Sequence, residues 1–319
     1  MTFQEIYNLA IKMGIDADLR SKEAILKNLK KVKEGFDKLT SEQKKYFDEE
    51  KLENPYSDTR ILNGDPKAKI KTIYTGIDID SAELMIARFM SRHSGRDIEL
   101  VLSHHPSGKA LAALDEVMYL QAEVLADYGV PINIAEGLMR PRISEVARGV
   151  GASNHQKAVD AARHLDFNFM CVHTPADNLV ATYLKKLMDK KNPETIGEVM
   201  NIIKEIPEYK IAGQLNAGPK IFVGSEEAKA GKIAISEITG GTDGSAQIYE
   251  KMAHAGIGTI IGMHMKEEHK KQAQEAHINV VIAGHISSDS LGMNLFLDEL
   301  EKKGIEIIPA SGLIRVKRK

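Results

Sequence analysis

Short apolar runs alternate with amphipathic stretches from about residue 69 to the end of the chain. The apolar runs predict strands at 69–78, 97–103, 167–173, 219–224, 232–238, 256–262, 278–284 and 305–310. The amphipathic stretches predict helices at 81–92, 110–129, 142–150, 155–165, 179–191 and 195–206. Residues 130–137 are expected to form a short strand or a turn. Strands that alternate with helices predict an α/β fold with a largely parallel sheet and flanking helices.

The first 60 residues differ from this pattern and form a predicted N-terminal helical extension. Ile6, Leu9, Ala10 and Met13 recur at helical spacing, and a lysine-rich stretch follows them. Such a charge run is typical of a solvated helix face, and the alternative is a surface for an anionic partner. Turn-forming residues at 53–66 mark the end of this extension.

A second boundary is indicated near residues 190–215, where the lysine-rich end of one helix gives way to turn-forming residues. It divides the rest of the chain into a first α/β part at 61–195 and a second at 196–319. The sequence shows no internal repeat at a fixed period.

Histidines and carboxylates gather where three of the predicted strands end. The sequence Ser-His-His-Pro begins at residue 103, His-Thr-Pro-Ala-Asp begins at residue 173, and His-Ile-Ser-Ser-Asp begins at residue 285. Ligands of open α/β sheets bind beyond the carboxyl ends of the strands, so the three clusters are expected at one edge. Candidate residues are His104, His105, His173, Asp177, His285 and Asp289.

The spacing of these residues suits metal binding. His173 and Asp177 are four residues apart, as are His285 and Asp289, so each pair shares one face if a helix begins just after the histidine. Thr174 or one of two serines after His285 would cap those helices. Imidazole and carboxylate groups together bind zinc, iron, manganese, cobalt or nickel. The ordinary alternative is that these histidines are buried in the core or exposed at the surface and bind no metal.

Two further histidine–carboxylate pairs have the same spacing. His93 with Asp97 lies in a polar loop and is expected to be exposed. His264 follows the strand 256–262, so it either lines the same edge or plays a capping or surface role. Spacing by itself therefore does not decide whether these residues form a metal site.

The charge, the cysteine content and the lack of long apolar stretches exclude several classes of protein. The formal net charge of the 319-residue chain is −2, which gives no global attraction to nucleic acid. Cys171 is the single cysteine, so an internal disulfide or a thiolate metal cage is excluded and a reducing cytoplasm is expected. No signal peptide or membrane-spanning apolar stretch is recognised.

In combination, the three motifs resemble the signature of the Nif-three-like family (NGG-one-interacting factor three), many bacterial members of which are called GTP cyclohydrolase 1 type 2 homologues. The family pattern is His-His-Pro, then His-Thr-x-x-Asp, then Gly-His-x-x-x-Glu, and the order here is the same. Asn-Gly-Asp-Pro at 63–66, Gly-Ile-Asp at 76–78 and the glycine-rich turn before the last motif add to the likeness. The resemblance covers roughly residues 60–319.

The resemblance implies a Nif-three-like fold in two related parts and a dinuclear metal centre. It assigns two divalent metal ions to His104, His105, Asp177, His285 and Asp289. It places His173 at the site as a ligand or as a neighbour of one. It also implies a homo-oligomer, commonly a ring-like homohexamer whose metals face an internal cavity.

Some features depart from the family or do not identify a role. Position 289 is Asp where the family usually has Glu, and the shorter side chain can change the bridging geometry. His173 and Asp78 are the candidate catalytic residues, although for Asp78 a turn after a strand is the favoured reading. The turn at 239–245 either binds a phosphate or simply joins a strand to a helix, and the second reading is favoured.

Two functions from different classes follow from these observations. The first is a metal-dependent hydrolase of a small phosphorylated or nucleotide-like substrate, with GTP cyclohydrolase-like ring opening as one form. The alternative is a metal-binding scaffold or regulatory interaction protein without turnover. Both predict bound metal, and only the first predicts product formation.

Overall fold

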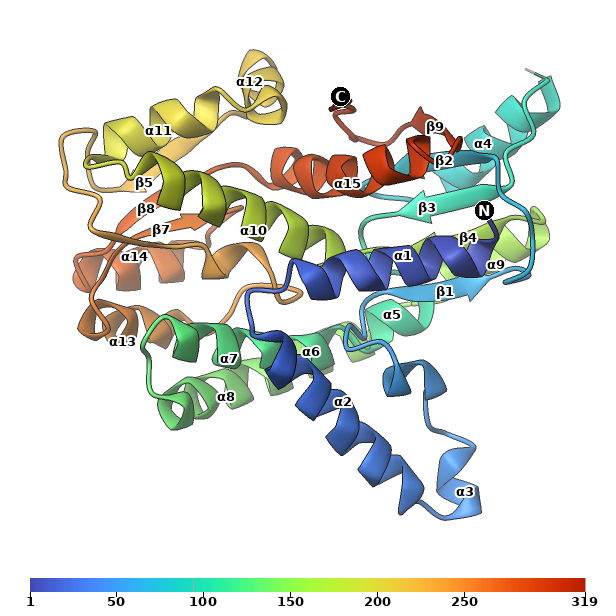
Figure 1. Ribbon diagram of the computed structural model, residues 1–319, viewed down its shortest axis with the longest axis horizontal. Helices are drawn as coiled ribbons and strands as arrows, with labels where there is room; N and C mark the ends of the chain where they lie inside the picture. The colour runs from blue at the N-terminus through green and yellow to red at the C-terminus, as the bar shows by residue number, and fades with distance from the viewer. Residues whose placement is uncertain (94, 319) are drawn as a thin grey trace.

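The protein contains two mostly parallel β-sheets surrounded by helices (Figure 1). The structure, a computed structural model, describes residues 1–93 and 95–318. The first sheet has the order β1-β4-β3-β2-β9, and the second has the order β5-β8-β7-β6. The strands are β1 (Arg60–Asn63), β2 (Thr72–Gly76), β3 (Leu100–Ser103), β4 (Asn168–Cys171), β5 (Lys220–Val223), β6 (Lys232–Ala234), β7 (Ile257–Gly262), β8 (Asn279–Ile282) and β9 (Glu306–Pro309). The predicted α/β class with mostly parallel sheets is confirmed.

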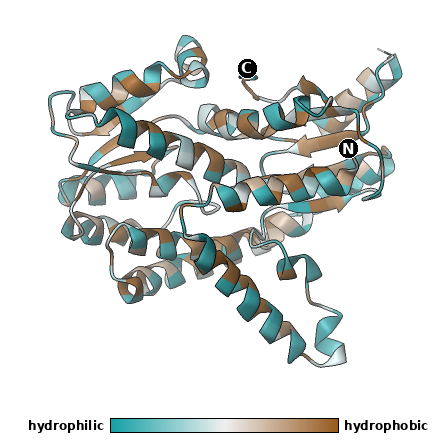
Figure 2. Cartoon of the chain, viewed as in Figure 1, coloured by the Kyte–Doolittle hydropathy of each residue, from teal (hydrophilic) through white to brown (hydrophobic). Residues whose placement is uncertain are grey.

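The central strands are buried on both faces, which explains their unbroken apolar sequences. Every residue of β2 and β3 is buried. Figure 2 shows β3 almost uniformly brown, the colour of apolar residues, whereas the surrounding helices carry teal stripes. Each sheet also has one edge strand, β1 or β5, that runs antiparallel to its neighbour.

The two sheets belong to related halves of the molecule, although the sequence shows no repeat at a fixed period. Each half has an antiparallel edge strand beside the last parallel strand of its βαβ run, and the register of that pairing shifts once in each half. In each half a helix follows a capping threonine that bridges to a lysine after the edge strand. The bridging pairs are Thr2 with Lys69 and Thr195 with Lys229. The likeness lies in backbone pairing, which different side chains satisfy equally well.

Helices flank both sheets and connect their parallel strands. They are α1 (Phe3–Asp16), α2 (Lys22–Asp37), α3 (Ser41–Lys44), α4 (Ser81–His93), α5 (Gly108–Ala112), α6 (Leu114–Val117), α7 (Tyr119–Asp127), α8 (Ile132–Gly151), α9 (Lys157–His164), α10 (Thr174–Lys191), α11 (Ile196–Lys204), α12 (Pro207–Gln214), α13 (Tyr249–His254), α14 (Glu267–Glu275) and α15 (His285–Glu301). Short 3-10 helices are η1 (Glu49–Leu52), η2 (Ser236–Ile238) and η3 (Ala246–Ile248). Among the described residues, none of these helices has the length and apolar character that a membrane span requires.

Two sequence-based expectations for the middle of the chain were wrong. The stretch 130–137, expected to be a strand or turn, starts the 20-residue helix α8. Pro131 precedes its first residue, where a missing N–H costs nothing, and Pro141 is accommodated inside the helix. The single helix expected at 110–129 is instead three short helices, α5, α6 and α7.

The helices α10 and α15 pack against each other between the two sheets (Figure 1). Their contact is close because Gly292 of α15 faces the backbone of α10: a Cβ atom at this position would lie 2.2 Å from the carbonyl oxygen of Ala176. Each of these helices begins directly after a central strand, α10 after β4 and α15 after β8. Residues at their first turns therefore face each other.

The N-terminal 60 residues divide into a packed part and a projecting part. Helix α1 packs on α10, with Phe3, Ile6 and Ala10 buried, as its apolar spacing predicts. Helices α2 and α3 project from the body (Figure 1), and Ile25 is the buried residue of α2. The boundaries 1–60, 61–195 and 196–319 stay a prediction, and the chain crosses between the sheets once more when β9 pairs with β2.

Candidate metal centre

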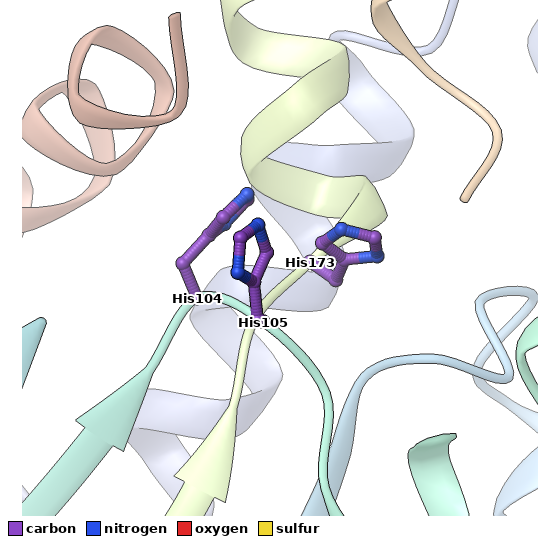
Figure 3. A group of neighbouring side chains, drawn as sticks. All are labelled: His104, His105 and His173. Carbon is purple, nitrogen blue, oxygen red and sulfur yellow. The ribbon is translucent and has the colours of Figure 1, made fainter. Parts of the chain in front are cut away.

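The three histidine–carboxylate clusters converge where the two sheets meet. His104 and His105 follow β3, His173 follows β4, and His285 opens α15 after β8. Figure 3 shows the rings of His104, His105 and His173 gathered at the ends of their two strands. The ring centroid of His104 lies 5.1 Å from that of His105 and 4.9 Å from that of His173. Adjacent parallel strands bring their carboxyl ends to one edge, which is why His104 and His173 meet although they are 69 positions apart.

His104 presents an unprotonated nitrogen to two carboxylates. Its Nδ1 lies 3.0 Å from the carbonyl oxygen of Val172, so Nδ1 carries the hydrogen and donates it. The lone pair of Nε2 then faces Asp177 Oδ1 and Asp289 Oδ1, each 3.5 Å away. Three potential ligand atoms thus meet in a buried place without a hydrogen bond among them.

The second oxygen of Asp289 faces a different pair of imidazoles. Oδ2 lies 3.5 Å from His105 Nε2 and 3.5 Å from His285 Nε2. On the far side of its ring, His105 donates from Nδ1 to Asp78 Oδ1 at 2.7 Å. Asp289 therefore stands between two ligand sets and offers one oxygen to each.

His173 is held by a carboxylate that sequence analysis did not single out. Its Nδ1 donates to Asp58 Oδ2 at 2.8 Å, and the hydroxyl of Thr174 donates to the same oxygen at 2.6 Å. The other ring nitrogen, Nε2, lies 4.0 Å from Asp177 Oδ2. A histidine whose one nitrogen binds a carboxylate while the other faces the site is the usual arrangement of a metal ligand and its supporting neighbour.

The unpaired atoms of the cluster fit a cation. His104 Nε2, Asp177 Oδ1 and both oxygens of Asp289 are buried and have no hydrogen-bond partner among the described residues. Such atoms are costly to bury unless something binds them. Two ligands bonded to one ion at about 2.1 Å with tetrahedral angles are about 3.4 Å apart, which the 3.5 Å separations match. The groups His104–Asp177–Asp289 and His105–His285–Asp289 could each hold an ion, as could the three histidines His104, His105 and His173.

Electrostatics agrees with a site that needs positive charge. Burial raises the pKa of the Asp177 carboxyl well above its usual value, and the carboxylates of Asp289 and Asp58 add to the effect. Burial also lowers the pKa of His104, which keeps that ring neutral. For His105 burial acts in the same direction, but Asp289 and Asp78 outweigh it and raise its pKa to about 9. A bound metal would displace the proton on His105, so metal affinity should rise with pH.

A polar cavity adjoins the cluster on the side of the second sheet. Its walls include His173, Asp177, His285 and Asp289 together with Glu237, Asp243 and His264. His264 follows β7, and its ring centroid lies 4.8 Å from that of His285. The site therefore receives side chains from the ends of β3 and β4 in the first sheet and from the ends of β7 and β8 in the second.

The glycine-rich turn at 239–245 closes one wall of this cavity. Gln121 of α7 donates from Nε2 to the carbonyl oxygens of Gly240 and Thr242 at 2.9 and 2.6 Å. Gly240 has a φ of +96°, and a Cβ atom there would lie 2.5 Å from the side chain of Gln121. The glycine is required by this close approach, which agrees with the reading of a tight turn rather than a phosphate loop.

A family model described as Duf34/NIF3 (NGG1p interacting factor 3) matches residues 143–311, which is more than half of the chain. The matched region contains the motifs that begin at His173 and at His285. The chain belongs to the Duf34/NIF3 family. The His104–His105 motif precedes the matched region, so its place in the site rests on the geometry above.

Solved structures of other proteins are similar to this chain. A NIF3 superfamily protein from Sphaerobacter thermophilus is 25% identical, with a TM-score of 0.67 over 81% of this chain and 92% of that chain. Reduced HcgD from Methanocaldococcus jannaschii is 16% identical, with a TM-score of 0.48 over 78% of this chain and 87% of that chain. The Staphylococcus aureus hypothetical protein SA1388 is 16% identical, with a TM-score of 0.45 over 82% and 93%. No curated protein matches the chain.

In this Duf34/NIF3 protein all five predicted metal ligands lie within one cluster, and their role as ligands stays a prediction. The predicted helix caps were wrong. Helix α10 begins at Thr174, so His173 takes the cap position, and α15 begins at His285 after Gly284, whose φ is +115°. Ser288 lies inside α15 and donates back to the carbonyl oxygen of Gly284 at 2.6 Å. Each histidine therefore sits at the very start of its helix.

The two predicted catalytic residues lie on different sides of the cluster. His173 borders the cavity, whereas Asp78 lies behind the ring of His105 with its side chain 70% exposed. Asp58 was not predicted because it stands among turn formers before β1. Its one signal is an acidic residue two positions before a short strand, which is too common to single it out.

Proposed function

We propose that this protein is a dinuclear-metal-dependent hydrolase of a small phosphorylated or nucleotide-like substrate. The observation that carries the proposal is the position of Asp289, whose Oδ1 is 3.5 Å from His104 Nε2 and whose Oδ2 is 3.5 Å from His105 and His285 Nε2. A carboxylate so placed can bridge two ions, and two-metal hydrolases hold their ions about 3.5–4 Å apart. His104 and Asp177 would complete one ligand set, and His105 and His285 the other.

Divalent ions in such a site supply a water of lowered pKa and stabilise negative charge on the reacting group. The protein's own residues would orient that chemistry. Asp58 fixes the ring of His173 so that its Nε2 faces the cavity, where it can accept a proton from a water molecule. Asp78 fixes the ring of His105 in the same way and acts as a positioning residue.

We also propose that the protein works in the cytoplasm as a homo-oligomer, with a hexamer as the form that the family resemblance suggests. GTP cyclohydrolase-like ring opening is proposed as one form of the activity on the same ground. Imidazole and carboxylate donors bind zinc, iron, manganese, cobalt and nickel. We therefore propose two divalent ions without naming the element. Light scattering of the purified protein measures the oligomeric state directly.

Elemental analysis followed by a substrate panel tests the function. The protein should hold close to two metal ions per chain, and His104→Ala and Asp289→Ala should reduce this number while the far-ultraviolet circular dichroism stays unchanged. His164→Ala, at an exposed position on α9, is the matched control. The metallated protein is then assayed on GTP, nucleoside monophosphates and aryl phosphates.

The outcomes separate the two functions. Product formation that disappears in His285→Ala supports the hydrolase. A protein that is fully metallated and converts no member of the panel is a metal-binding scaffold instead. Fewer than one metal ion per chain, with no change in His104→Ala, contradicts the dinuclear centre itself.

A further inference from the structure

Glu237 lies in the cavity beside the metal cluster and has no part in the ligand sets. It belongs to η2, directly after β6, which neighbours β7 in the second sheet. The ends of β7 and β8 carry His264 and His285, so Glu237 occupies the corresponding position on the next strand. Its side chain borders the same cavity as Asp289 and His173.

The surroundings of Glu237 favour its protonated form. Burial, with the Asp243 carboxylate adding to it, raises the pKa of Glu237 to about 7, although His264 and Tyr249 act in the opposite direction. The Tyr249 hydroxyl of α13 lies 3.5 Å from Glu237 Oε2. No lysine or arginine is among the described residues that line the cavity. At neutral pH a large fraction of Glu237 therefore carries a proton.

Glu237 differs in this respect from the other carboxyl groups around the cavity. His264 Nδ1 lies 3.0 Å and Lys266 Nζ lies 3.2 Å from the oxygens of Asp243. Burial opposes ionisation of Asp243, but these two partners prevail and lower its pKa to about 2, so it stays ionised. Asp177 and Asp289 face the histidines of the ligand sets. Among the described residues that line the cavity, Glu237 is the carboxyl that neither forms an ion pair nor belongs to a ligand set.

We propose that Glu237 is the catalytic acid of this site and protonates the leaving group, an inference that rests on the proposed hydrolase function. A water molecule forms the new bond to the phosphorus or carbon atom and gives up one proton. The bond to the leaving oxygen or nitrogen breaks, and that atom takes the proton of the Glu237 carboxyl. The proton released by the water restores Glu237, so one water is consumed and no other reactant is needed. Carboxylic acids buried beside another carboxylate serve as proton donors at neutral pH in this way.

A pair of leaving groups tests this role. The probes are 4-nitrophenyl phosphate, whose leaving group carries its own charge well, and guanosine 5′-monophosphate, whose alkoxide leaving group needs a proton. Glu237→Gln keeps the size of the side chain and removes the acid. It should lower kcat on guanosine 5′-monophosphate by about 100-fold or more and leave kcat on 4-nitrophenyl phosphate within a few-fold. Glu250→Gln, an exposed change on α13, is the matched control and should alter neither.

The pH profile supplies a second readout that a merely structural role would not move. Because the acid must be protonated to act, kcat of the wild type on guanosine 5′-monophosphate should fall as the pH rises through about 7. Glu237→Gln should lack this descending limb while it holds the same number of metal ions.

Two results would overturn the inference while the hydrolase itself stands. One is an equal loss of kcat on both probes, and the other is an unchanged descending limb in Glu237→Gln. If the fully metallated wild type converts neither probe, both the catalytic acid and the proposed hydrolase are contradicted. Activity of the wild type therefore distinguishes failure of the hydrolase proposal from failure of the Glu237 assignment alone.

Discussion

Removing the negative charge of the buried Asp177 carboxyl should increase the free energy of unfolding of the metal-free protein. The carboxyl faces the unprotonated Nε2 of His104 and the carboxylates of Asp289 and Asp58, and none of these groups compensates a negative charge. Asp177→Asn preserves the shape of the side chain and removes the charge. The same change removes a charged metal ligand, so its effect should depend on whether metal is present.

The sign follows from proton linkage. Burial, Asp289 and Asp58 raise the pKa of Asp177 in the folded protein above its ordinary value of 3.8, so the folded state binds this proton more tightly than the unfolded chain does. The free energy of unfolding of the metal-free wild type should therefore fall as the pH rises above 3.8, until the folded-state pKa is passed. Each unit of difference in pKa is worth about 1.4 kcal/mol. The asparagine variant should escape this loss and be more stable by about 1–3 kcal/mol at pH 7 without metal.

Metal should reverse the order of stability. At a free metal concentration about 1,000 times Kd, the wild type gains about 4 kcal/mol from binding. Asp177→Asn lacks an anionic ligand and should gain much less. With metal present, the wild type should therefore be the more stable of the two.

Urea denaturation at pH 7, in EDTA and again in excess Mn²⁺, measures both quantities. Asp189→Asn, an exposed change on the same helix, is the control and should shift the free energy of unfolding by less than about 0.5 kcal/mol in either condition. If Asp177→Asn is less stable than the wild type in EDTA and responds to Mn²⁺ as the wild type does, the reasoning from unpaired charge is refuted.

Three substitutions and one chemical modification test other parts of the structure. Asp58→Asn should weaken metal affinity by about 10–100-fold, because it loosens the ring of His173, and competition with a chelator measures this; unchanged affinity would remove Asp58 from the site. Gly292→Ala should destabilise the protein in urea by about 1–3 kcal/mol, since its Cβ would meet the α10 backbone at 2.2 Å. Gly149→Ala, with open space around it, should instead be neutral or stabilising by up to about 1 kcal/mol, and equal effects would contradict the packing argument. Burial raises the pKa of the Cys171 thiol to about 12, so a disulfide reagent at pH 8 should modify it only after unfolding, and fast reaction of the folded protein would show that this strand opens.

The central strands were predictable because their composition reflects their burial, whereas β1 (Arg60–Asn63) was missed because it lies among the turn formers of 53–66. Runs such as Leu100–Ser103 are apolar on both faces, which fits a parallel strand covered by helices whatever its neighbours are. The stretch 130–137 misled because a proline and β-branched residues lower helix propensity, while packing of Ala135 and Met139 against the core holds it in α8.

The candidate site was partly predictable for a similar reason. His104, His173 and His285 each follow an apolar strand directly, so a strand prediction already places them at a sheet edge. Asp58 and Glu237 have no such local signal. Asp58 acts through a hydrogen bond to a residue 115 positions away, and Glu237 acquires its character from burial and from Asp243.

The sequence by itself therefore determined the central strands, the residues that offer metal-binding atoms and the family they resemble, because these properties depend on residue type and order. Tertiary structure alone decided that the two sheets bring their strand ends together, that Asp289 offers one oxygen to each ligand set, and that Glu237 borders the same cavity. Distances between residues far apart in the chain and the dielectric around a carboxyl are properties of packing. The distances between the ligand sets depend on the close packing of α10 against α15 at Gly292.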